Sequence, residues 1–334
     1  MKQHVNIPVF IPHLGCPHMC VFCDQRSITG REFDPGDIER QISEALITVK
    51  DGADCEIAFF GGSFTGIGET LMRRLLSVAA RFVEEGRASG IRLSTRPDYI
   101  DLQTLSILAE YPVKTVELGI QSMDNKVLRM SKRGHTAEQS SEACRLVVKH
   151  GFSLVGQMMI GLPGADERSE IKTAEDICAL GATGARIYPT VVLKNTELEE
   201  MSRDGRYLPL SLDEAIGRSA SVLEIFIAYG VPVIRLGLCA SDGLSLEGAV
   251  GGAYHPAMGE LVRGELYRRK IEAELVSAGI SDRDSITIEV PRGAVSMAIG
   301  NGGRNRADIQ SKFNIKSLKT VENPRLKEYN VKVE

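Results

Sequence analysis

Six strand-like segments, each followed by a helix-like segment, constrain the fold of this 334-residue chain most strongly. The strand-like runs are almost wholly apolar, which is typical of parallel strands covered by helices on both faces. Successive βα units imply right-handed crossovers. We therefore expect an α/β barrel or a doubly wound sheet, which periodicity alone does not separate. The expected strands are 5–11, 55–60, 91–96, 115–120, 153–160 and 185–192, and the expected helices are 35–50, 69–85, 101–109, 124–149, 167–180 and 211–229.

Three of the seven cysteines, Cys16, Cys20 and Cys23, lie within eight residues directly after the first expected strand. No signal-peptide pattern and no membrane-spanning apolar stretch is visible, so we expect a cytoplasmic protein with reduced thiols. Zinc would need a fourth ligand, for which His13 and His18 are candidates. An iron–sulfur cluster suits the loop better, because three thiolates leave one iron open. We expect the other cysteines to be small apolar fillers: Cys55, Cys144, Cys178 and Cys239.

The spacing Cys16-x3-Cys20-x2-Cys23 resembles the cluster loop of the radical S-adenosylmethionine (radical SAM) enzymes. The resemblance implies a 4Fe–4S cluster on these cysteines, with S-adenosylmethionine chelating the fourth iron. It implies an α/β fold of the partial (βα)6 TIM-like barrel type, extended by a strand at 233–238. It also implies a low-potential electron donor such as ferredoxin or flavodoxin. Phe22, just before the last cysteine, is expected beside the cofactor.

Barrel enzymes carry their chemistry at the C-terminal ends of the strands. The second strand ends in Gly61, Gly62 and Ser63, which is similar to the superfamily motif for the amino group of S-adenosylmethionine. Paired glycines let a backbone approach a ligand closely. By resemblance, further contacts to the cofactor come from Gln121, Arg133, Gln157 and Met159. The Arg133 guanidinium suits the cofactor carboxylate because it can bind it bidentately. The alternative interpretation of Arg133 is a surface ion-pair residue.

Four further polar residues have a functional and a structural interpretation. Glu117 and Arg96 lie at or near strand ends, where they would form a buried pair beside the cofactor or a structural ion pair. Tyr188 would line the pocket or belong to the core. His255 is a candidate substrate-side group, but a lone histidine before proline is more often structural.

The stretches TRPDYI, VELGIQS, RGHT and IYPTVV together resemble the catalytic subunit family of the Elongator complex and its bacterial and archaeal relatives. Members of this family modify the wobble uridine of tRNA. The resemblance covers residues 6–209 and implies a radical SAM enzyme that acts on tRNA or another RNA. The family also carries an acetyltransferase-like domain. Residues 210–334 show no matching motif, so we expect no binding of acetyl-coenzyme A.

The C-terminal stretch 283–334 is expected to fold as strand, helix, Gly-rich loop, helix and strand. Its loop is similar to the Ile-Gly-x-x-Gly core of a KH domain, which clamps the backbone of single-stranded nucleic acid. The stretch holds ten Lys or Arg and six Asp or Glu, a charge of +4, whereas the rest of the chain carries −8. A basic segment on an acidic protein indicates a local polyanion contact, the alternative being a structural cap. The expected RNA contacts are Gly300, Asn301, Gly302, Gly303, Arg304 and Arg306.

Three parts and three function classes follow from these observations. Residues 1–235 are expected to form the radical SAM partial barrel, 236–282 a Gly-rich connector and helix that cover it, and 283–334 the KH-like segment. The protein would be a radical SAM enzyme acting on RNA, a radical SAM enzyme acting on a small metabolite or tetrapyrrole, or a non-enzymatic iron–sulfur RNA-binding protein. The set of cofactor motifs argues against the third class, and the C-terminal segment favours the first.

Overall fold

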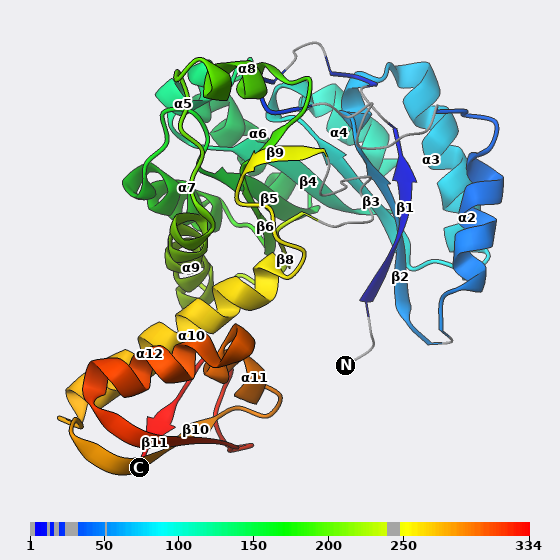
Figure 1. Cartoon of the computed structure of the whole chain (residues 1–334). Helices are drawn as coiled ribbons and strands as arrows, with labels where there is room; N and C mark the ends of the chain where they lie inside the picture. The colour runs from blue at the N-terminus through cyan, green and yellow to red at the C-terminus, as the bar shows by residue number, and fades with distance from the viewer. Residues whose placement is uncertain (1–3, 12–13, 17–19, 24–32, 51, 239–247) are drawn as a thin grey trace.

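A curled parallel sheet and a smaller C-terminal unit, joined by a long helix, make up the molecule (Figure 1). The computed structural model describes residues 4–11, 14–16, 20–23, 33–50, 52–238 and 248–334. The connecting helix is α10 (Met258–Ser277), which leaves the sheet and packs against the C-terminal unit. His13, His18 and Cys239 lie outside the described residues.

The main sheet has seven strands, all parallel, in the order β1-β2-β3-β4-β5-β6-β8. The six expected strands are confirmed, and the expected extension at 233–238 forms the seventh. Neighbours in the sheet are also neighbours in the sequence of strands, as right-handed βα units require. The strands are β1 (His4–Phe10), β2 (Asp54–Phe60), β3 (Gly90–Thr95), β4 (Val113–Gln121), β5 (Ser153–Ile160), β6 (Gly184–Pro189) and β8 (Val233–Leu236).

The helices cover the outer, convex face of this sheet (Figure 1). Apolar strand residues such as Ile57, Leu93 and Leu118 are completely buried beneath them. Burial of each such side chain stabilises the fold by about 1.5–3 kcal/mol. The helices are α2 (Ile38–Ile47), α3 (Glu69–Glu84), α4 (Leu102–Ala109), α5 (Asn125–Met130), α6 (Ala137–Lys149), α7 (Glu167–Ala179), α8 (Glu197–Arg203) and α9 (Leu212–Ala228), with short 3-10 turns at Phe64–Gly66 and Pro97–Tyr99.

The single helix expected over 124–149 is wrong, because the structure has two helices there. Lys132 (φ 52°) and Gly134 (φ 77°) adopt left-handed backbone conformations, which end α5. Thr136 then caps α6 by accepting a hydrogen bond from the Gln139 backbone N–H, and the Gln139 side chain accepts one in return. The break matters for the site, since it turns Arg133 inward.

The curl of the sheet brings distant strands together across its concave face. The Arg186 guanidinium of β6 lies over the Phe60 ring of β2, 5.2 Å from its centroid. Three strands separate β2 from β6 in the sheet, so a flat sheet would hold these two side chains well apart. The concave face is therefore the interior of a half-barrel, as the fold-class expectation requires.

The C-terminal unit is built on a three-stranded sheet in the order β11-β10-β12. The elements follow the expected order of strand, helix, Gly-rich loop, helix and strand. β10 and β11 are parallel, and β12 is antiparallel to β10. The elements are β10 (Arg283–Val290), α11 (Val295–Ile299), a 3-10 turn (Asn301–Gly303), α12 (Arg304–Phe313), β11 (Ile315–Glu322) and β12 (Lys332–Val333).

Two smaller features complete the described chain. β7 (Val191–Leu193) and β9 (Ala249–Gly252) form a two-stranded antiparallel sheet beside the strand ends. Among the described residues, none of the helices combines the length and hydropathy that a bilayer span needs.

Candidate functional site

The cysteine loop is anchored at the C-terminal edge of the sheet by backbone hydrogen bonds. The Val21 N–H donates to the Ser131 carbonyl (3.2 Å), and the Leu198 N–H of α8 donates to the Val21 carbonyl (2.8 Å). A turn between Cys20 and Cys23 is closed by an N–H···O bond of 3.0 Å. Loops that follow β1, β4 and β6 thus converge on the same place.

Three glycines interlock this loop with the end of β2. An added Cβ at Gly15 would lie 2.2 Å from the Ser63 carbonyl oxygen, and one at Gly62 would lie 2.3 Å from the Leu14 carbonyl oxygen. An added Cβ at Gly66 would likewise lie 2.5 Å from the Gly15 carbonyl oxygen. Only glycine allows backbones to approach this closely. Gly62 therefore serves the packing of the cysteine loop.

The expected residues at the end of β2 are placed at this edge. Gly61 has φ +104°, a conformation that L side chains rarely adopt. The Ser63 N–H donates to the Leu14 carbonyl (3.0 Å), and the Ser63 hydroxyl shares a hydrogen bond with Thr95 (2.8 Å). Ser63 is completely buried, so its role in the described structure is to tie β2 to β3.

Arg133 reaches the cysteine loop from the break between α5 and α6. Its Nη1 donates to Cys20 Sγ at 3.1 Å, and its Nη2 donates to the Gly119 carbonyl at 2.5 Å. Only 6% of Arg133 is exposed, so the alternative of a surface ion-pair residue is wrong. Because the guanidinium cannot lose its proton, it brings a fixed positive charge to the cysteine loop.

A second arginine, Arg96, approaches the same thiols. Its side chain forms a bidentate ion pair with Asp98 (3.0 and 2.9 Å) and donates to the Arg133 carbonyl. Burial raises the pKa of the Cys16 thiol, while Arg96 and Arg133 act in the opposite direction. Two guanidiniums thus offset the negative charge that thiolates would bring.

Several buried polar atoms at this edge have no hydrogen-bond partner among the described residues. They are Arg96 Nη1, Arg133 Nε, Gln121 Oε1, Ser131 Oγ and His135 Nδ1. Leaving such an atom unpaired costs about 1–3 kcal/mol, so a polar ligand is expected to satisfy it. Gln121 also has φ 68°, a strained conformation at the irregular end of β4. Strain and orphaned donors in one place are typical of a ligand site.

The remaining expected cofactor residues lie nearby on different elements. Gln157 and Met159 of β5 are half-buried, whereas Met158 and Ile160 between and after them are fully buried against the helices. This alternation directs the two former side chains to the concave face. Phe22 packs against a small apolar cluster, namely Val21, Val192, Leu198, Met201 and Tyr207.

The donor set fits a 4Fe–4S cluster chemically. One loop supplies three soft thiols, and guanidiniums and orphaned donors lie beside them. Among the described residues, His, Cys, Asp and Glu side chains do not form a converged metal-binding group of three. The fit therefore rests on the chemistry of the donors and on their shared location. Cys55, Cys144 and Cys178 are buried in the core, in agreement with their expected role as fillers.

The expected pair between Glu117 and Arg96 is wrong. Glu117 is completely buried and binds Arg92 Nη1 (2.8 Å) and Arg186 Nε and Nη2 (2.7 and 2.9 Å). Arg92 in turn binds Glu56. Arg96 points instead to Asp98. The register pairs Glu117 with Ser94, so Glu117 lies further inside the sheet than Arg96, which follows the end of β3.

Sequence reasoning missed this network of charges on the concave face. The signal was present, since Glu56, Arg92, Glu117 and Arg186 are charged residues inside otherwise apolar strand segments, as Arg96 and Arg235 also are. Tyr188, on the same face of β6, lies 3.4 Å from an Arg186 terminal nitrogen. Tyr188 thus faces the concave side of the sheet, which agrees with a position lining the interior rather than the core beneath the helices.

The Gly-rich loop of the C-terminal unit lies between α11 and α12. Gly300 has φ +80°, and an added Cβ would lie 2.6 Å from the Asn305 side chain. Packing therefore requires a glycine at this position. Gly302 (φ +60°) has open space around it, and Asn301 is exposed. Asn305 ties the loop to α10 through its amide, which donates to the Gly264 carbonyl (2.8 Å).

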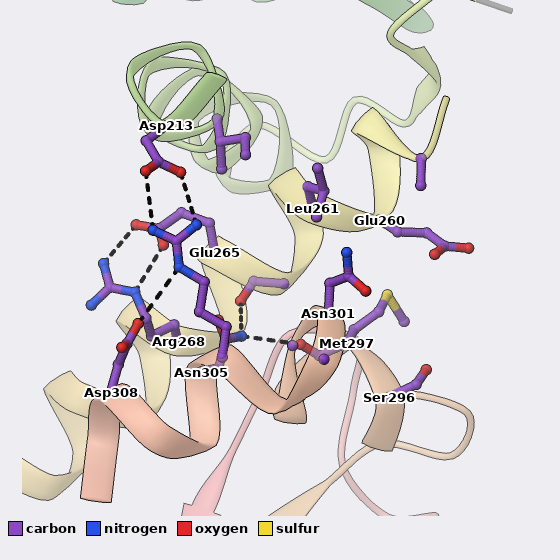
Figure 2. A pocket seen from close by; sticks show the side chains of 16 residues that line it. Asp213, Glu260, Leu261, Glu265, Arg268, Ser296, Met297, Asn301, Asn305 and Asp308 are labelled. Atoms are coloured by element: carbon purple, nitrogen blue, oxygen red, sulfur yellow. Dashed lines mark hydrogen bonds and ion pairs between the residues drawn. The ribbon is translucent and has the colours of Figure 1, made fainter. Parts of the chain in front are cut away.

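A pocket of about 550 Å³ opens on one side of this loop, between α9, α10 and α12 (Figure 2). Its charged lining residues are four carboxylates and two arginines. Arg304 is held by Asp213 of α9 through two bonds (2.8 and 3.1 Å), a contact that sequence reasoning missed. Arg306 is exposed and has no carboxylate partner among the described residues. The carboxylates are Asp213, Glu260, Glu265 and Asp308.

Comparison with known proteins identifies the family. The family model of the Radical SAM superfamily matches residues 10–177, half of the chain. The chain belongs to the radical SAM superfamily. Residues 182–268 of this radical SAM chain match the Radical_SAM C-terminal domain. The superfamily uses a 4Fe–4S cluster and S-adenosylmethionine, so both are cofactors of this radical SAM enzyme, and the expected fold and family are confirmed.

Individual relatives extend this assignment. An uncharacterized protein of Methanocaldococcus jannaschii is 31% identical and covers 68% of this chain and 74% of its own length. A tRNA uridine(34) acetyltransferase of the same organism is 29% identical over 60% of this chain and 45% of its own. Elongator complex protein 3 of Bos taurus is 28% identical over 64% and 48%. The radical SAM chain thus spans about half the length of the latter two relatives.

Solved structures agree on the fold. Elp3 from Methanocaldococcus infernus superposes with a TM-score of 0.62 at 23% identity, covering 80% of this chain and 64% of that one. The streptococcal enzyme SuiB, bound to S-adenosylmethionine, gives 0.53 at 14% identity, covering 72% and 52%. At such identities the likeness concerns the fold alone.

Proposed function

We propose that Cys16, Cys20 and Cys23 hold the 4Fe–4S cluster of this enzyme, and that the enzyme modifies RNA, with tRNA as the substrate class. When bound, the cluster would pass one electron from a low-potential donor, of the ferredoxin or flavodoxin kind, to S-adenosylmethionine. Reductive cleavage of the C5′–S bond would yield methionine and a 5′-deoxyadenosyl radical, which would abstract a hydrogen atom from the substrate. The observation on which this proposal rests is the contact between the cysteine loop and Arg133, whose Nη1 lies 3.1 Å from Cys20 Sγ.

The groups around the loop suit the polar parts of S-adenosylmethionine. Its carboxylate is matched by the guanidiniums of Arg133 and Arg96, each of which has a buried nitrogen without a partner. Its ribose hydroxyls suit the unpaired Gln121 Oε1, which can only accept. Gly61 and Gly62 expose backbone at the strand end. We assign Phe22, Ser63, Gln157 and Met159 to the same site on their placement around it.

The cluster assignment is tested by replacing the three loop cysteines with alanine. Anaerobically reconstituted wild type is expected to bind about four irons per chain and to form 5′-deoxyadenosine from S-adenosylmethionine and dithionite. The triple variant should lose both. Cys55→Ala is the matched control, because it removes a buried thiol outside the loop and should keep both. A triple variant that retains its iron refutes the ligand assignment.

The RNA substrate is supported by two independent observations. Relatives from three organisms are named tRNA uridine(34) acetyltransferase. The C-terminal unit also presents a glycine loop followed by the N-terminus of α12, where backbone N–H groups favour a phosphate. We assign phosphate contact to the exposed tip of the loop, Asn301 and Gly302, and to Arg306, which does not line the carboxylate-bearing pocket on one side of the loop.

The placement of the two sites favours an extended RNA. α8, which contacts the cysteine loop, lies at the top of Figure 1, and α11 and α12 lie at the bottom. One RNA bound at both places must therefore span much of the molecule. A folded RNA of the size of tRNA meets this requirement, whereas a mononucleotide does not.

Filter binding of tRNA tests this part of the proposal. The double change Asn301→Asp and Gly302→Asp places two carboxylates in the path of phosphates, and affinity should fall at least about tenfold. Gly279→Asp is the matched control, because Gly279 (φ +62°) shares with Gly302 a left-handed conformation and open space. The logarithm of the wild-type binding constant should also fall linearly with the logarithm of salt concentration. Equal affinity of the double variant and the control would leave the C-terminal unit a structural cap and favour a small-molecule substrate.

A further inference from the structure

Two arginines stand side by side on the concave face of the half-barrel. The parallel pairing of β6 and β8 places Arg186 directly opposite Arg235. Partners on adjacent strands project from the same face, with Cβ atoms about 5 Å apart. Tyr188, two residues after Arg186 on β6, projects from the same face, and its hydroxyl lies 3.4 Å from an Arg186 terminal nitrogen.

The two arginines differ in how their charge is balanced. Arg186 is neutralised by a bidentate contact to Glu117. Arg235 donates through Nε to the Gly237 carbonyl at 3.0 Å, and no carboxylate of the described residues pairs with it. Glu56 and Glu117 balance Arg92 and Arg186, so among the residues that the structure describes Arg235 is the guanidinium of this face without a carboxylate partner.

An unbalanced guanidinium beside a second guanidinium is unfavourable in a half-buried site, because like charges repel more strongly where water is partly excluded. The arrangement becomes favourable when an anion joins it. The Gly237 contact also fixes the Arg235 guanidinium through Nε, which leaves both terminal nitrogens to donate in parallel to one acid group. The Tyr188 hydroxyl can supply a further donor from the adjacent strand.

We infer that Arg235 and Tyr188 bind the acid group of the molecule that occupies the half-barrel, either a carboxylate or a phosphate ester. The inference rests on the proposed function in one respect, since the occupant would be the substrate or a second small substrate of the radical reaction. Arg235 is then a substrate-binding residue, and its neighbour Arg186 stays neutralised in the wall.

The test measures binding of small anions to the anaerobically reconstituted full-length enzyme by titration calorimetry. The probes are acetate, inorganic phosphate, uridine 5′-monophosphate and uridine. Wild type should bind at least one of the anions and not uridine. Binding should weaken tenfold or more in Arg235→Gln and less in Arg235→Lys, which keeps the charge. Arg292→Gln, which removes an exposed arginine of the C-terminal unit, should bind as wild type does.

Each outcome bears on the inference. Preference for acetate identifies a carboxylate ligand, and preference for uridine 5′-monophosphate identifies a phosphate ester. Equal anion binding by wild type and Arg235→Gln overturns the inference, as does an equal loss of S-adenosylmethionine affinity, which would assign the guanidinium to the cofactor. Failure of wild type to form 5′-deoxyadenosine would instead count against the proposed function, and the anion titration would still report on Arg235.

Discussion

Removal of the Glu117 charge is the sharpest test of the interior network. Glu117 is completely buried, and the side chains of Arg92 and Arg186 are 9% and 12% exposed. Three charge-assisted hydrogen bonds of 2.7–2.9 Å join them. In Glu117→Gln the side chain keeps its shape but loses its charge, and two guanidiniums remain opposite a neutral amide.

Breaking a buried ion pair by changing one partner costs about 3–5 kcal/mol, because the other charge is left uncompensated. The amide oxygen of Gln still accepts one hydrogen bond, so we expect the lower end, about 3 kcal/mol. Urea unfolding followed by circular dichroism should show the midpoint falling accordingly. The thermal midpoint should fall by roughly 6 °C or more.

The matched control is Glu110→Gln. Glu110 also pairs with an arginine, Arg73, through two bonds, but its side chain is 54% exposed. Exposed pairs contribute about 0–1 kcal/mol, so this variant should unfold close to wild type. If the two variants lose the same stability, burial of the Glu117 network does not determine its energy and the reasoning fails.

Three further outcomes follow. Burial, with help from Arg133, lowers the pKa of His135 to about 3, so below about pH 6.5 the unfolded state binds a proton at this residue and the folded state does not. Between pH 7 and pH 5 the free energy of unfolding, measured by urea titration, should therefore fall by about 2 kcal/mol less in His135→Gln than in wild type. Equal losses in the two proteins would exclude a neutral buried His135. Asp213→Asn removes the carboxylate that pairs with the Arg304 guanidinium, so the affinity for tRNA in filter binding should rise about two- to fivefold at low salt. An unchanged affinity would remove Arg304 from the RNA contacts. Calorimetry with acetyl-coenzyme A should show no binding, and millimolar or tighter binding would contradict the interpretation of residues 210–334.

The family and the order of the strands could be predicted from the sequence, because both are written in local patterns. Near-continuous apolar runs mark each parallel strand wherever it later lies. The spacing of Cys16, Cys20 and Cys23 is likewise a local property of one loop. The same holds for the order of elements around Gly300–Gly303, since helix ends and glycine loops depend on neighbouring residues.

Tertiary structure alone decided which side chains meet. Arg133 touches Cys20 across 113 positions of sequence because Lys132 and Gly134 break a helix that periodicity predicted to be continuous. Glu117 pairs with Arg92 and Arg186 rather than Arg96, because the register of three strands and the curl of the sheet set the contacts. Strand register and sheet curvature arise from the packing of all the helices together, so no single segment encodes them.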